Sequence, residues 1–244
     1  MTASSPAPGA VRVSELLQTA ARLFRATLLK CLPLGMLAMV CWQLPNFYWT
    51  ATGHQLGLKA QYDLNFNLLT VVGTTVELWL LGAMMLRQRA VAVGAPLQTG
   101  AELRAATHRL PVMLLSALLA TISIAAGLLL LVVPGLYLCV CYLVWLPVVL
   151  FDGTGPYASL VRSVHLIRPL WPKALTALVI VLLLAIIAAI VFGAVLAALA
   201  GLLGSDGPAF EALSAAGTVA FGALFVVFLS ALQLVLHSAA SNSA

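Results

Sequence analysis

Long apolar runs alternate with short polar segments along the whole chain. Six runs are apolar enough to cross a lipid bilayer, at about 31–49, 66–86, 111–131, 136–151, 174–203 and 213–236. A spanning helix needs about 20 mainly apolar residues, because the hydrocarbon core of a bilayer is about 30 Å thick. The pattern predicts an all-α integral membrane protein with six transmembrane helices, which form a single membrane domain over 11–237.

The composition excludes a soluble globular protein. Hydrophobic residues make up 63% of the 244 residues, charged residues make up 8%, and the mean hydropathy is +1.09. A soluble domain has about 45–50% apolar and about 25% charged residues. Ser, Pro and Ala dominate 1–10, so we expect that segment to be disordered.

Positive charge is concentrated in every second connector between the apolar runs. Eleven of the twelve Lys and Arg residues form three clusters: Arg12, Arg22, Arg25 and Lys30; Arg87, Arg89, Arg104 and Arg109; Arg162, Arg168 and Lys173. Cytoplasmic loops of membrane proteins carry such an excess of positive charge. We therefore predict that both termini are cytoplasmic, with 238–244 as a short tail.

Each basic cluster coincides with helical periodicity, which predicts amphipathic helices along the cytoplasmic surface. Before the first span, Leu16, Ala20 and Phe24 would form one face, opposite Arg22 and Arg25. Such a helix can rest in the headgroup layer with its apolar face in the lipid. An amphipathic helix followed by a membrane hairpin would occur three times, which suggests a threefold repeat.

Local signals predict where the second and third amphipathic helices begin. Thr99 and Glu102 have the spacing of a capping box, in which each side chain bonds a backbone N–H at the helix start. Asp152 or Thr154 would cap the third helix, with Pro156 in its first turn.

The basic residues beside the spans are candidate contacts for lipid headgroups. The candidates are Arg22, Arg25, Arg104, Arg109, Arg162, Arg168 and Lys173. Each basic residue near an anionic membrane surface contributes about 1 kcal/mol of attraction. We exclude nucleic acid, because the clusters are short and lack interleaved aromatic residues. The expected partners are anionic membrane lipids, and a homodimer or another membrane protein remains open.

The fifth run is longer than a bilayer is thick. A helix over 174–203 would be about 45 Å long, so it should tilt, bend near Gly193 or project beyond the membrane. Small residues recur along it at Ala185, Ala189, Gly193, Ala197 and Gly201. Small residues at this spacing let a second helix approach closely, either inside the bundle or in a homodimer.

One acid falls near the middle of a predicted span. Glu77 shares a helical side with Thr70, Gly73 and Thr74. An ionised residue at that depth costs about 2.5–3.5 kcal/mol on insertion scales. Either Glu77 is a protonated group that locks the bundle by hydrogen bonding, or it binds a proton, a cation or a polar headgroup. Gln233, in the last run, could pair with Glu77 or could join helices by itself.

The sequence offers no arrangement for catalysis or metal binding. The four histidines are far apart, and the four cysteines lack the spacing of a zinc site or a disulfide framework. No nucleophile–base pair or Gly-rich phosphate loop is present in the sequence. We therefore expect no enzymatic activity, no cofactor and no metal.

The region after the third run resembles a known family. Pro134-Gly135 predicts a tight turn. It leads on to Pro147 and Asp152, and then to Ala158-Ser159-Leu160-Val161-Arg162-Ser163 and Leu170-Trp171-Pro172-Lys173. This stretch resembles the YciC-like bacterial inner-membrane proteins and the related membrane domain of some glycerophosphoryl diester phosphodiesterases. Ala158-Ser159-Leu160 and Trp171-Pro172 depart slightly from the family pattern. The resemblance implies a six-helix bundle in a bacterial inner membrane and carries no catalytic role.

We expect a non-enzymatic, multi-pass membrane protein that helps to organise membrane lipids or membrane proteins. One alternative is a small transporter or permease-like subunit with Glu77 on its pathway. Another is an accessory membrane subunit of a partner enzyme.

The predicted topology can be tested with reporter fusions. A reporter enzyme that works only in the cytoplasm should be active when it is fused near Glu102, because the second basic cluster surrounds that position. A reporter that works only in the periplasm should be inactive there. An active periplasmic reporter at the same position would contradict the predicted orientation.

Overall fold

The computed structural model describes residues 12–52, 63–96, 98–203 and 208–242, and every element in these ranges is helical. Six helical segments are long and apolar enough to cross a membrane. These findings confirm the predicted all-α fold of a multi-pass membrane protein. The predicted disorder of 1–10 concerns residues outside the described ranges.

The helical segments cover the six predicted runs, except for Leu131 at the end of the third, and extend beyond them. The elements are α1 (Val13–Ala51), α2 (Leu64–Ala92), α3 (Thr99–Leu130), α4 (Val132–Cys141), α5 (Trp145–Pro147), α6 (Pro156–Ile167), α7 (Trp171–Leu203) and α8 (Pro208–Ser241). Two short 3-10 turns and a π-helical turn, Val148–Asp152, connect some of them. Because α8 continues to Ser241, most of the expected C-terminal tail is helical.

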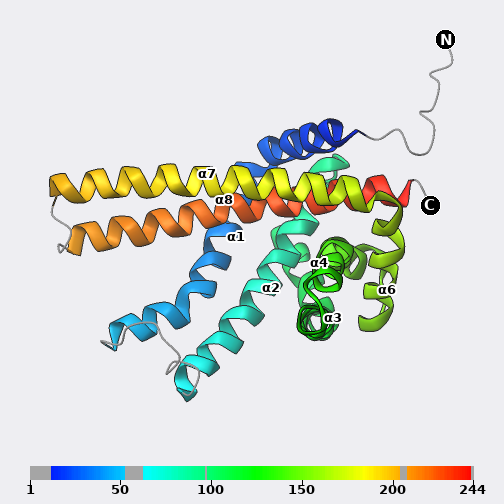
Figure 1. Ribbon diagram of the computed structural model, residues 1–244, viewed down its shortest axis with the longest axis horizontal. Helices are drawn as coiled ribbons and strands as arrows, with labels where there is room; N and C mark the ends of the chain where they lie inside the picture. The colour runs from blue at the N-terminus through cyan, green and yellow to red at the C-terminus, as the bar shows by residue number, and fades with distance from the viewer. Residues whose placement is uncertain (1–11, 53–62, 97, 204–207, 243–244) are drawn as a thin grey trace, which may run out of the picture.

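Three helix pairs diverge from one region of the molecule. Figure 1 shows α7 and α8 side by side along the long axis, with α2 and the later part of α1 descending at an angle. The same view looks almost straight down α3. Each predicted hairpin is thus present, although the three point in different directions.

The N-terminal amphipathic segment is the beginning of α1 rather than a separate helix. One helix of 39 residues covers this segment and the first span. Its direction changes along its length (Figure 1), and Pro33 lies inside it, where a proline removes a backbone hydrogen bond and bends the helix. Leu16 and Ala20 are buried in the main hydrophobic core. The expectation that this apolar face rests in lipid was wrong, because other helices of the chain cover it.

The main core lies at the end of the molecule where the three helix pairs meet. It combines the start of α1, the 140–148 segment, α6, the start of α7 and the end of α8. In α6, Ile167 belongs to this core and Leu160 is also buried, whereas Arg162, and Arg168 just after the helix, are exposed. The predicted amphipathic pattern of this helix is confirmed.

The chain reverses between α3 and α4 at Leu131, three residues before Pro134. Leu131 has an extended backbone with φ of −162°, whereas Pro134 and Gly135 already belong to the first turns of α4. Gly135 lies against Gly127, where a Cβ would come within 2.9 Å of the Gly135 Cα. The prediction of a Pro-Gly turn was wrong, because Gly135 serves the close approach of α3 and α4.

Neither predicted capping arrangement occurs. The N-cap residues of α3 and α6 are Gln98 and Gly155. Pro156 does occupy the first turn of α6, as its fixed φ favours. The side chains of Thr99, Glu102 and Asp152 bond elsewhere, as described below.

The long helix α7 projects from the core as an arm. Its 33 residues, which include Gly193, span about 50 Å, and Figure 1 shows α7 without a sharp bend. Ala189, Gly193, Ala197 and Gly201 are exposed, and no atom lies within 4 Å of a Cβ built on either glycine. Packing of this stripe inside the bundle was therefore a wrong expectation.

The close packing of α1 on α2 predicts a contrast between two glycines. A Cβ at Gly73 would lie 2.5 Å from the backbone oxygen of Cys41 on α1. Gly73→Ala should destabilise the protein by about 1–3 kcal/mol, because overpacking forces backbone shifts. Gly193→Ala is the matched control and should leave stability unchanged or slightly higher. Unfolding in a detergent titration measures both, and equal stability of the two variants would contradict this packing.

Candidate functional site

A buried arginine, Arg87, holds three helices together. The Arg87 guanidinium of α2 donates from Nε to Glu102 Oε2 at 2.8 Å and from Nη2 to Thr99 Oγ1 at 2.9 Å, both on α3. Its Nη1 donates to the Lys30 carbonyl of α1 at 2.8 Å. The side chains of Arg87 and Glu102 are only 11% and 9% exposed. The planar fork of arginine suits such multiple bonding.

This anchor explains why the predicted capping box is absent. Thr99 and Glu102 do share a side of α3, but their oxygens accept from Arg87 instead of from their own backbone. Sequence reasoning placed Arg87 among the surface charges. A signal in the sequence could have revealed the pair: Arg87 directly follows an apolar run, and Glu102 lies in the first turn of the next helix. Opposite charges therefore meet where the two helices pack.

Two further polar side chains attach α2 to its neighbours. Trp79 Nε1 donates to Thr107 Oγ1 at 2.9 Å and lies 3.2 Å from the Leu103 carbonyl of α3. The fully buried Gln88 donates from Nε2 to the Val227 carbonyl of α8 at 2.9 Å. Together with Arg87, these bonds fix the end of α2 against α1, α3 and α8.

The end of the π-helical turn and the glycine that follows it gather basic side chains from several helices. The Arg89 guanidinium lies 4.2 Å from the centre of the Phe151 ring, a cation–π contact. Asp152 accepts a hydrogen bond from Arg162 Nε, and its Oδ1 lies 3.5 Å from His237 Nε2. Arg109 Nη1 reaches the Gly153 carbonyl at 3.5 Å. We call these residues the basic junction; they are Phe151, Asp152, Gly153, Arg89, Arg109, Arg162 and His237.

The backbone of the basic junction depends on a glycine. Gly153 has φ of 68°, the left-handed conformation that ends helices and that other residues rarely adopt. A Cβ there would also come within 3.1 Å of Arg109 Nη2. Gly153 thus ends the membrane segment and lets Arg109 approach it.

A groove of about 580 Å³ opens beside the basic junction. Three helices form it: α1 supplies Thr19, Arg22 and Leu23; the end of α2 supplies Arg89 and Val91; the end of α8 supplies Leu234, His237, Ser241 and Asn242. Phe151 closes one side, and no acidic residue is among the lining residues. The volume falls within the range of about 300–1,000 Å³ that is common for ligand sites.

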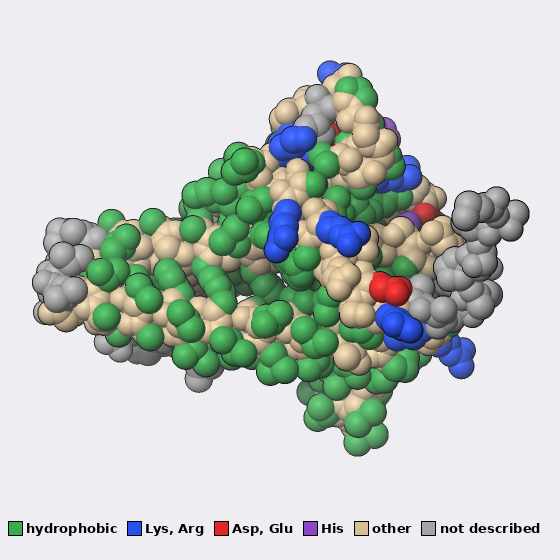
Figure 2. Space-filling view, turned by 90° about the horizontal axis from the view of Figure 1, so that it is seen from above, with side chains coloured by type: hydrophobic (Ala, Val, Ile, Leu, Met, Phe, Trp, Pro, Cys, Tyr) green, Lys and Arg blue, Asp and Glu red, His purple; other side chains and the backbone are tan. Residues whose placement is uncertain are grey.

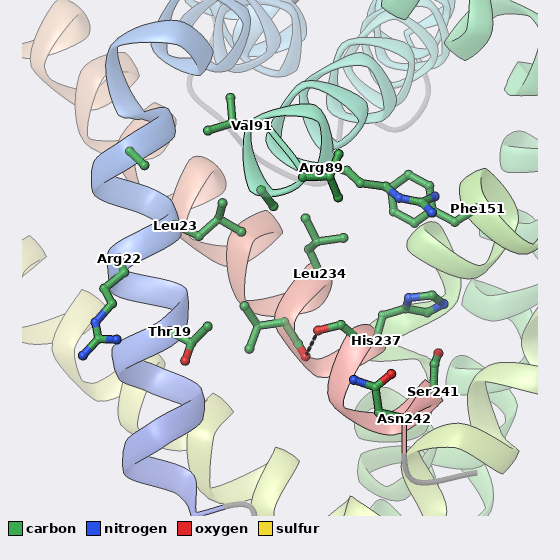
Figure 3. A pocket seen from close by; sticks show the side chains of 15 residues that line it. Thr19, Arg22, Leu23, Arg89, Val91, Phe151, Leu234, His237, Ser241 and Asn242 are labelled. Atoms are coloured by element: carbon green, nitrogen blue, oxygen red, sulfur yellow. Dashed lines mark hydrogen bonds between the residues drawn. The ribbon is translucent and has the colours of Figure 1, made fainter. Parts of the chain in front are cut away.

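The groove is apolar towards one end and polar towards the other. Figure 3 shows Leu23, Val91 and Leu234 on one side, whereas Ser241, Asn242 and His237 lie together on another. Arg89 stacks on Phe151, and the guanidinium of Arg22 lies on the outer side of α1, turned away from His237 (Figure 3). The arrangement could therefore accept an amphiphilic molecule.

The predicted lipid-contacting residues lie at the broad end of the molecule, away from the arm formed by α7 and α8. We call this end the basic side. Figure 2 shows Lys and Arg side chains on it, whereas the arm formed by α7 and α8 shows apolar side chains on the same face. The exposed residues are Arg22, Arg25, Arg104, Arg162 and Arg168; Arg109 and Lys173 are partly buried. Arg104 and Arg109 line a second cavity, of about 560 Å³, with His108.

The predicted intramembrane polar site is not assembled. Glu77 is partly buried, and in the described ranges it makes no hydrogen bond, either to Gln233 or to another residue. Thr70 bonds the Phe66 carbonyl of its own helix, and Thr74 is exposed. The interpretation of Glu77 as a hydrogen-bonded lock was wrong. The amide that joins helices is Gln88.

Within the described ranges, the site also offers no cluster of three or more His, Cys, Asp or Glu side chains that could hold a metal ion. Comparisons with known proteins add no relative, since no family model, curated protein or solved structure matches the chain.

The Arg87 anchor predicts a strong asymmetry between single and double substitutions. Glu102→Leu should destabilise the protein by about 3–5 kcal/mol, because it leaves the Arg87 charge buried without a partner. The double variant R87M/E102L should recover much of that loss. Arg104→Met, which removes an exposed charge from the same helix, is the control and should have little effect. Melting temperatures in detergent measure the effect, and a mild effect of E102L would contradict the role of the anchor.

Proposed function

We propose that this chain is a non-enzymatic, multi-pass protein of a bacterial inner membrane that binds and organises anionic lipid at its cytoplasmic face. The YciC-like resemblance of the sequence supports the assignment to a bacterial inner membrane. The arginines of the basic side support the binding of anionic lipid. In this proposal the start of α1, the end of α8 and the basic junction all face the cytoplasm.

The unpaired arginines are the observation that carries the proposal. Among the described residues, Arg22, Arg25, Arg104, Arg109 and Arg168 have no acidic partner within 4.0 Å. Asp152 and Glu102 already engage Arg162 and Arg87. Anionic headgroups would neutralise the remaining charges, at about 1 kcal/mol for each residue near the surface.

Lipid binding also accounts for the shape of this side better than transport does. The groove beside the basic junction opens between helix ends, whereas Glu77, on which a transport pathway would depend, does not line it. An accessory role towards a partner enzyme would use the same basic side and would appear as a protein that copurifies in stoichiometric amount.

Lipid preference can be measured directly in reconstituted vesicles. Spin-labelled phosphatidylglycerol should associate with the protein several-fold more strongly than spin-labelled phosphatidylcholine, and added salt should weaken that preference. The triple variant R25Q/R104Q/R168Q should lose most of the preference, because it removes three exposed charges outside the groove.

The charge-preserving variant R25K/R104K/R168K is the matched control and should keep the preference. Equal association of the two lipids with the unaltered protein would contradict the proposed function.

A further inference from the structure

The groove beside the basic junction has the features of a site for one lipid molecule rather than of a general basic surface. It is concave, it is formed by three helices that polar bonds hold in place, and its lining contains two arginines and no acid. A diffuse charged surface would attract headgroups without holding any of them in a defined position.

The positive charge of the groove favours an anionic ligand. Arg22 and Arg89 are exposed and have no acidic partner among the described residues. The Arg89 guanidinium lies over the Phe151 ring and makes no hydrogen bond to another described residue, so its N–H groups remain available to an anion. Arg22 also lines the groove, but its guanidinium lies on the outer side of α1 (Figure 3), so Arg89 supplies the charge nearest to Phe151 and His237.

The surroundings of Arg89 favour a fixed position for this anion. Asp152, whose Oδ1 lies 3.5 Å from His237 Nε2, already accepts from Arg162 and therefore leaves Arg89 uncompensated. His237 is only 9% exposed and lines the groove beside Phe151, with ring centres 6.1 Å apart. The guanidinium is thus held by stacking while its charge remains unneutralised.

The two ends of the groove distinguish a lipid from a free anion. Leu23, Val91 and Leu234 provide apolar walls suited to the first carbons of acyl chains. Ser241 and Asn242 provide hydrogen-bonding groups at the polar end, suited to the hydroxyl groups of a headgroup. Inorganic phosphate would leave the apolar part of the groove unused.

We propose that this groove binds one anionic phospholipid, with its phosphodiester at Arg89 and its headgroup hydroxyls near Ser241 and Asn242. The acyl chains would leave along Leu23 and Leu234. This inference rests on the proposed function, and it adds a single defined lipid to the general attraction of the basic side.

Native mass spectrometry of the protein released from nanodiscs containing phosphatidylglycerol and phosphatidylcholine tests the inference. The unaltered protein should retain one phosphatidylglycerol. Arg89→Gln should lower the retained fraction about tenfold or more, because it removes charge-assisted hydrogen bonds to the phosphate. Arg25→Gln lies outside the groove on α1, and it should change retention less than twofold.

A second variant blocks the groove without altering its charge. Val91→Trp should displace the retained lipid, while the several-fold preference for spin-labelled phosphatidylglycerol in vesicles should persist. Melting temperatures close to that of the unaltered protein show that both variants remain folded.

The remaining outcomes separate the two proposals. Equal loss of lipid in the Arg89→Gln and Arg25→Gln proteins, with the vesicle preference intact, would overturn the groove and leave the proposed function standing. Absence of any preference for anionic lipid would overturn both. Displacement of the retained lipid by soluble glycerol 3-phosphate at low concentration would assign the groove to a free phosphate compound instead.

Discussion

The buried guanidinium of Arg87 is the constraint on which the arrangement of the helices depends. It joins α1, α2 and α3 through one carboxylate, one hydroxyl and one backbone carbonyl. A buried charge is costly unless its donors are satisfied, so helix positions that leave Arg87 unpaired are disfavoured. Bonds of this kind specify the relative positions of apolar helices, which contacts between apolar side chains alone define weakly in a membrane.

This constraint has consequences for the rest of the molecule. Arg87, Gln88 and Trp79 fix the end of α2 against three helices, and the main core lies on the same side of the molecule. Beyond that side the helix pairs diverge (Figure 1). Many large apolar side chains of α7 are exposed. The groove forms where α1, α2 and α8 separate, next to the charges that the anchor does not use.

The basic residues therefore divide into two kinds that look alike in the sequence. Arg87 and Arg162 are engaged by acids, whereas Arg22, Arg25 and Arg104 are exposed and have no acidic partner in the part of the chain that the structure describes. The neighbouring residues Arg87 and Arg89 show the difference clearly. One is buried between helices and the other stacks on Phe151 at the groove, because they lie on different sides of the same helix.

The sequence by itself determined the helical class and the number and positions of the apolar segments, because the length and hydropathy of a run depend only on local composition. It also placed the amphipathic face of α6. Only the tertiary structure decided which polar side chains meet. Glu102 pairs with Arg87 instead of capping α3, Gly135 packs on Gly127 instead of forming a turn, and Gln88 rather than Gln233 joins two helices. These outcomes depend on how distant helices cross, and the spacing of residues along one helix carries no information about that crossing.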